Sequence, residues 1–122
     1  MSSTGIEIRE RARDGVHTIE LAGELDITAV PSLEAEVRHL CEGERARDLR
    51  GITLDLGGLQ FIDSTGIAAI VLVSRICAKH GYAFALLEGP RSVQRLFETT
   101  GLIDELPFRE RELADESPAG RG

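Results

Sequence analysis

The longest apolar segment of the chain places the tightest constraint on its fold. It runs from Thr65 to about His80 and is densest in the stretch GIAAIVLVS. Its length and its two alanines favour a helix over a strand, and an apolar surface this broad predicts a helix packed against a sheet. The segment is too short to span a bilayer, so we expect no membrane partner.

A hairpin is predicted near the start of the chain. Apolar residues alternate with charged ones from Ile6, and a similar alternation runs from Val16 to Leu21. A period of two is typical of half-buried strands. Between the two runs stand Asp14 and Gly15, a pair that favours a tight turn. The two strands are therefore expected to pair in antiparallel fashion.

The stretch GELDITAVP, residues 23–31, is interpreted as a loop that leads into a helix. Pro31 suits the first helical turn, and Thr28 or Ser32 could cap it. Apolar residues then recur at helical spacing as far as Gly43, which is a stop signal. The residues on this inner face are Leu33, Val37, Leu40 and Cys41.

Further strands and another helix are predicted in the rest of the chain. A short strand is expected from Ile52 to Leu56, followed by a loop at Gly57 and Gly58. Segment 44–50 is expected to be a solvated loop because its charges are of mixed sign. The long helix ends at Gly81, and a strand at Tyr82–Leu87 follows it. A helix is then expected between Pro90 and Gly101, with Val93, Leu96 and Phe97 facing inward. The last predicted element is a turn with an edge strand around Pro107.

The order of these elements, β-β-α-β-α-β-α-β, predicts an α/β domain with a mixed β-sheet of about five strands covered by helices. The 122 residues fit a single domain, which we place at residues 1–108. Residues 109–122 have few apolar side chains and many Pro, Gly and charged residues, so a disordered C-terminal tail is predicted.

The composition excludes several classes of partner. A formal net charge of −7 and a pI near 4.9 argue against nucleic acid or an anionic membrane. Cys41 and Cys77 fit neither a zinc site nor a CxxC motif, and we expect both to be buried free thiols. The first residues lack the pattern of a signal peptide, so a cytoplasmic protein is expected.

No pattern in the sequence supports catalysis. The HExxH, GxSxG, phosphate-loop and GxGxxG motifs are absent, and His17, His39 and His80 are scattered. We therefore expect no enzyme activity, no cofactor and no metal. A phosphoaspartate receiver with Asp55 at a strand end is a weaker alternative, because the chain lacks the converging acids and the strand-end lysine of such a Mg²⁺ site.

The stretch FIDSTG, residues 61–66, directly precedes the long helix. Ser64 is expected at or beside the N-cap, where capping alone would explain a hydroxyl. A phosphate on Ser64 would sit at the positive end of the helix dipole, where exposed N–H groups can receive it. Asp63 would repel the same phosphate. The residues by themselves leave capping and modification open.

Two motifs, GELD and DSTG, carry a resemblance to a known family. In the stretches GELDITAVPSLEAEV, ITLDLGGLQFIDSTGIAAI and SVQRLFETTGLIDELPF the chain resembles the bacterial anti-sigma-factor antagonists, single-domain members of the STAS superfamily. The resemblance covers about Ile6 to Phe108. It implies a STAS-type single domain and the function of a binding protein.

The family resemblance implies partner switching. Members bind an anti-sigma factor, typically a serine protein kinase, and thereby free the sigma factor that it holds. The kinase inactivates the antagonist by phosphorylating the serine after the motif's aspartate, which maps onto Ser64, with Thr65 as the second candidate. A PP2C-type phosphatase reverses this modification. ATP and Mg²⁺ belong to the kinase.

The resemblance also implies a partner-binding surface around Ser64. It maps onto Glu24, Asp26, Asp63, Thr65, Gly66 and Ile67. The alternative is a STAS interaction module that assembles constitutively in a signalling assembly or a lipid-transport complex, without a phosphorylation switch.

Overall fold

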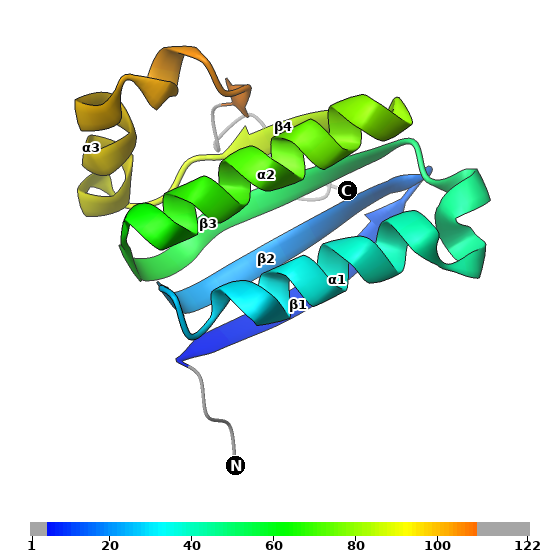
Figure 1. The fold of residues 1–122 in the computed structure, drawn as a ribbon, viewed down its shortest axis with the longest axis horizontal. Helices are drawn as coiled ribbons and strands as arrows, with labels where there is room; N and C mark the ends of the chain where they lie inside the picture. The colour runs from blue at the N-terminus through cyan, green and yellow to red at the C-terminus, as the bar shows by residue number, and fades with distance from the viewer. Residues whose placement is uncertain (1–4, 110–122) are drawn as a thin grey trace, which may run out of the picture.

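The computed structural model describes residues 5–109, which form a five-stranded mixed sheet with helices (Figure 1). The strand order is β1-β2-β3-β4-β5, so each strand pairs with the next one along the chain. β1 and β2 are antiparallel, and the other neighbours are parallel. The bounds are β1 Ile6–Arg13, β2 Val16–Leu25, β3 Gly51–Ile62, β4 Ala83–Leu87 and β5 Phe108–Arg109. Apart from Arg109, the predicted tail lies outside the described residues.

Three α-helices connect the parallel strands: α1 Val30–Glu42, α2 Ser64–His80 and α3 Arg91–Thr100. Figure 1 shows α1 and α2 side by side across one face of the sheet, as expected when successive parallel crossovers share one hand. The predicted α/β class, the strand number and the antiparallel start are confirmed. No helix within residues 5–109 is long and apolar enough to cross a membrane.

The core is aliphatic and fills the space between the sheet and its helices. Alternate residues of β2 and β3 face the helices, and Leu21 and Leu54 are at most 1% exposed. The predicted inner face of α1 is buried throughout. From α2 the core receives Ile67, Ala69, Ile70, Val73 and Cys77.

The turn between β1 and β2 has the conformation that its residues favour. Asp14 has a φ of 53° and Gly15 a φ of 85°, so both lie in the left-handed region. Asp and Gly tolerate this region, and such a turn follows the twist of the flanking strands. The hairpin prediction is therefore confirmed in its position and in its turn residues.

β3 is longer than the predicted strand, which was expected to end at Leu56. The pair Gly57-Gly58 stays within the strand instead of forming a loop. A Cβ on Gly58 would lie 2.9 Å from both the Cβ of Ala22 and the carbonyl oxygen of Leu21. The β2–β3 register shifts at this point, so glycine here permits a close backbone approach at a bulge.

Two other predicted loops are also wrong in part. β2 continues through Leu25, so the first three residues of GELD are strand and not loop. Segment 44–50 contains the short 3-10 helix η1, Glu44–Asp48. Leu49, near the end of this charged segment, is 7% exposed and belongs to the hydrophobic core. A second short helix, η2 Leu102–Asp104, and β5 fit the predicted turn and edge strand.

The two cysteines are buried free thiols, as predicted. Burial raises the pKa of Cys77 to about 12 and also raises the pKa of Cys41. Because the thiolate is the reactive form, neither residue should react with DTNB at pH 8 in the native protein. Both should react in guanidinium chloride, as measured by release of thionitrobenzoate. Fast native labelling of Cys77 would contradict its burial.

Candidate functional site

The two sequence motifs meet where β2 and β3 end side by side. Leu25 pairs with Ile62 at the end of the parallel ladder. The N–H of Asp63 then donates to the carbonyl oxygen of Leu25 at 3.4 Å. Each strand leads into a helix, and α1 and α2 begin at the same end of the sheet (Figure 1). Strand pairing therefore brings the GELD and DSTG segments together.

Asp63, and not Ser64, caps α2. One oxygen of Asp63, Oδ1, accepts the N–H of Thr65 at 3.0 Å and the N–H of Gly66 at 3.1 Å. It also accepts the hydroxyl of Thr65 at 2.6 Å. Ser64 does lie beside the N-cap, but capping by its hydroxyl is wrong because the carboxylate already satisfies these donors.

Ser64 is the first residue of α2, and its side chain is exposed. Within residues 5–109 its hydroxyl takes part in no hydrogen bond. The Thr65 hydroxyl differs in both respects, because it is half-buried and donates to Asp63. Of the two adjacent side chains, that of Ser64 is the more exposed, and its hydroxyl is not held by Asp63.

The hydrogen bonds to Asp63 also favour the ionised form of its carboxylate. The pKa of Asp63 lies below its ordinary value, chiefly because the Thr65 hydroxyl donates to the carboxylate. The N–H groups of Gly66 and Thr65 lower the pKa further, while desolvation partly opposes them. A negative charge therefore stands next to the Ser64 hydroxyl at neutral pH.

This cap changes what a phosphate on Ser64 would meet. The start of a helix favours an anion because its N–H groups lack partners. In α2 the N–H groups of Thr65 and Gly66 already bind Asp63. A phosphate would therefore add negative charge beside an ionised carboxylate, where two nearby donors are occupied.

Asp26 builds a second turn of the same geometry ahead of α1. Its Oδ1 accepts the N–H of Thr28 at 3.1 Å, the Thr28 hydroxyl at 2.7 Å and the N–H of Ala29 at 3.2 Å. Each distance is 0.1 Å longer than its counterpart at Asp63. The predicted capping by Thr28 or Ser32 is wrong, because Ala29 is the N-cap residue of α1 and no side chain caps this helix.

The lack of a side chain at Gly66 allows the two turns to lie close together. A Cβ on Gly66 would lie 2.3 Å from the carbonyl oxygen of Leu25 and 2.8 Å from Cγ1 of Ile62. These contacts leave no room for a side chain. The first turn of α2 is therefore packed directly on the end of β2.

The other predicted site residues divide into surface and core. Glu24 is exposed, and Asp26 is half-buried at the start of its turn. Gly66 and Ile67 are buried, and Ile67 is 6% exposed within the core. The structure brings all of these residues to one end of the sheet, but the Ile67 side chain packs inward.

Two exposed apolar side chains at this end are not predicted by the sequence patterns. Ile27 is 68% exposed and Phe61 is 48% exposed. Phe61 pairs with Glu24 in the β2–β3 ladder. The sequence did contain one indication that Ile27 belongs to the site: it stands between Asp and Thr, as Ser64 does.

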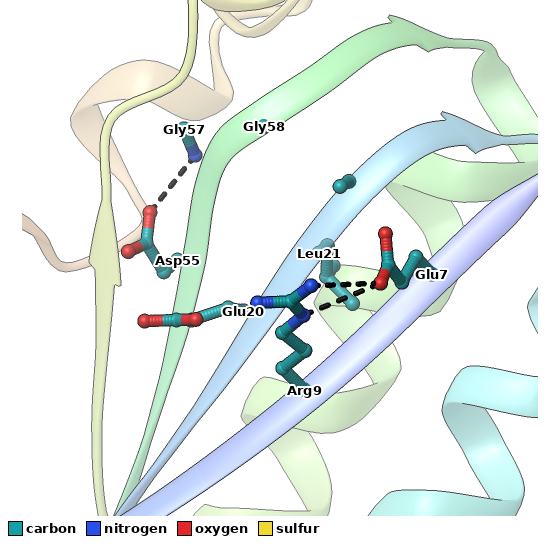
Figure 2. A pocket seen from close by; sticks show the side chains of 8 residues that line it. Glu7, Arg9, Glu20, Leu21, Asp55, Gly57 and Gly58 are labelled. Carbon is teal, nitrogen blue, oxygen red and sulfur yellow. Dashed lines mark hydrogen bonds and ion pairs between the residues drawn. The ribbon is translucent and has the colours of Figure 1, made fainter.

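A cavity of about 450 Å³ lies on the face of the sheet that α1 and α2 do not cover (Figure 2). In it Arg9 donates to Glu7 at 3.2 and 3.3 Å, and Asp55 accepts the N–H of Gly57 at 2.9 Å. Asp55 is 8% exposed and lies inside β3, not at a strand end. This position counts against the phosphoaspartate receiver.

The histidines lie away from Ser64. His17 is near the start of β2, where its Nδ1 contacts the carboxylate of Glu10. His39 and His80 are in the last turns of α1 and α2. All three are therefore at the end of the sheet opposite Ser64, so no histidine is placed to act as a base for its hydroxyl.

The sequence matches the family model for the STAS domain over residues 7–113. The chain therefore belongs to the STAS domain family, as the GELD and DSTG motifs predicted.

Several proteins of known name or structure are similar to this chain. The anti-sigma-B factor antagonist of Staphylococcus aureus is 28% identical over 105 residues, which cover 86% of this chain and 94% of that protein. A solved anti-sigma factor antagonist from Mycobacterium paratuberculosis superposes with a TM-score of 0.72 at 22% identity, covering 84% of each chain. The phosphorylated form of the Bacillus cell fate determinant SpoIIAA gives a TM-score of 0.66 at 20% identity, over 91% of this chain and 97% of that one.

Replacing Asp63 by alanine should lower the free energy of unfolding by about 1 kcal/mol, because the first N–H groups of α2 lose their acceptor. The folded pKa of Asp63 lies below the unfolded one. Its stabilisation is therefore present above the unfolded pKa and is lost as the pH falls through the folded pKa. Urea denaturation should show a smaller difference from wild type at about pH 3 than at pH 7.

Ser64→Ala is the matched control for this experiment, because it removes the neighbouring hydroxyl and leaves the Asp63 carboxylate in place. It should change stability little. A loss as large as that of Asp63→Ala would contradict the assignment of Asp63 as the cap.

Proposed function

We propose that this protein is an anti-sigma-factor antagonist, which binds an anti-sigma factor of the serine-kinase type and so frees a sigma factor. Phosphorylation of Ser64 switches it off, and a PP2C-type phosphatase restores it. The observation that carries the proposal is the exposed, unbonded hydroxyl of Ser64 beside the Asp63 cap. The similarity to a curated antagonist over 94% of that protein's length supports it.

Ser64 is a better phosphoacceptor than Thr65 on geometric grounds. A kinase must bring the accepting oxygen in line with the γ-phosphate of ATP, so the hydroxyl has to be reachable. The Ser64 side chain is exposed at the first residue of α2. Phosphorylation of Thr65 would instead break its 2.6 Å hydrogen bond to Asp63.

The proposed switch acts through charge. A phosphate carries about −1.5 to −2 charges at neutral pH. Asp63 and Asp26 lie in neighbouring turns at the same end of the sheet, so a contact formed there already contains carboxylates. An unpaired charge buried at an interface costs several kcal/mol, on the order of a hundredfold or more in affinity. The fold itself does not have to change.

Incubation with the organism's serine-kinase anti-sigma factor, ATP and Mg²⁺ should place one phosphate on Ser64. Mass spectrometry of the digested protein measures its position. Ser64→Ala should abolish the label, because no other exposed hydroxyl stands at the start of α2. Equal labelling of the Ser64→Ala protein would overturn the assignment.

Ser64→Asp should weaken binding to this kinase by about tenfold or more, since it adds a charge within the proposed contact. The circular dichroism spectrum should not change. Lys79→Gln is the control, because it makes the protein more negative by the same amount at the far end of α2. If Ser64→Ala and Ser64→Asp both leave every partner's affinity unchanged, a constitutively assembling STAS module becomes the better interpretation.

A further inference from the structure

Two of the exposed large apolar side chains of the described region lie at the end of the sheet that carries Ser64. Ile27 and Phe61 are 68% and 48% exposed, which is more than Val16 at 37% or Leu72 at 39%. Val16 starts β2, at the opposite end of the strand from this site. Exposed apolar residues are common on protein surfaces, so the position of these two side chains carries more information than their exposure.

Ile27 occupies the same place in its turn as Ser64 does in the other. In both turns an aspartate oxygen binds the N–H and the hydroxyl of the threonine two residues later, and the N–H that follows. The residue between aspartate and threonine is left outside these bonds. Both Ile27 and Ser64 are exposed.

Strand pairing sets the two turns next to each other. Neighbouring strands lie about 5 Å apart, and the last β2–β3 pairs are Glu24 with Phe61 and Leu25 with Ile62. Gly66 lies directly against the carbonyl oxygen of Leu25. Ile27 therefore lies in the turn next to that of Ser64, and Phe61 lies at the end of the strand that leads to Ser64, with its side chain on the face opposite the buried Ile62.

We propose that Ile27 and Phe61 are the apolar anchors through which the kinase-type anti-sigma factor binds this protein. The proposal rests on the proposed function, because it takes the enzyme that modifies Ser64 as the occupant. A stable protein contact covers about 800 Å² on each partner, a patch on the order of 30 Å across. A contact of this size centred on Ser64 would extend over the turn that carries Ile27 and over the strand end that carries Phe61.

The surrounding charges define the chemistry of the partner's surface. Glu24 is exposed beside Phe61, and the carboxylates of Asp26 and Asp63 stand at the base of the two turns. Interfaces of this kind have an apolar centre and a polar rim. The matching surface is an apolar pocket with basic groups around it, next to the kinase active site.

The anchors would also raise the cost of a phosphate on Ser64 in the complex. A contact between Ile27 and an apolar pocket excludes water, and a charge costs most where water is excluded. A phosphate on Ser64 would lie at the border of this contact. Removing the anchor should let water in and make the added charge less costly.

The direct test is the affinity of Ile27→Ala and Phe61→Ala for the organism's serine-kinase anti-sigma factor, measured by isothermal titration calorimetry. Each should weaken binding by about tenfold, as truncated anchors do. Val16→Ala, a similar truncation at the other end of β2, should stay within about twofold of wild type. Ile27→Val should restore most of the affinity, and circular dichroism should show that all four variants are folded.

A double-mutant cycle gives a second readout. Ser64→Asp should weaken binding by a smaller factor in the Ile27→Ala protein than in wild type, because the two side chains share one contact. If Ser64→Asp weakens binding by the same factor in both proteins, Ile27 and Ser64 are not coupled, and the proposed role of Ile27 beside the phosphate is wrong.

The outcomes separate the anchors from the proposed function. If the kinase labels Ser64 and binds wild type, but binds both alanine variants equally well, the anchor assignment is wrong and the function stands. If the kinases of the organism neither bind nor label the wild-type protein, both proposals fall.

Discussion

The parallel pairing of β2 with β3 is the constraint on which the site depends. It brings Leu25 and Ile62 together at the ends of their strands, and it leaves no room for a side chain at Gly66. Both helices then start from fixed positions, since each follows a turn held by an aspartate. The candidate site is therefore anchored in the sheet, and its geometry does not rely on a long loop.

Much of the fold could be predicted because its signals are local. The turn at Asp14-Gly15 lies between two alternating patterns, and α2 is recognisable from its apolar length and from Gly81 at its end. These signals act within a few residues, so they can be recognised without knowing what packs against them. The antiparallel start, the parallel crossovers and the three helices all follow from them.

The wrong predictions concern features that depend on distant residues. Gly57-Gly58 suggests a loop by itself, but Ala22 of the neighbouring strand approaches so closely that glycine is needed within β3. Aspartate and serine are both good caps, so the sequence could name Ser64 without showing that Asp63 takes the donors. Ile27 is apolar, so its residue type by itself suggests burial, yet it is 68% exposed in a turn at the end of the sheet.

The occupied helix cap explains why one modification could act on binding and spare the fold. Two unit charges 4 Å apart interact by about 1 kcal/mol in water and by about 4 kcal/mol at an effective dielectric of 20. In the free protein the Ser64 side chain faces solvent, so repulsion from Asp63 would be weak. In a complex that covers Ser64 the same pair would lie in a lower dielectric, and the phosphate would also lose its water. Because Asp63 retains the N–H groups of Thr65 and Gly66, the free helix need not reorganise, and the cost would fall on the complex.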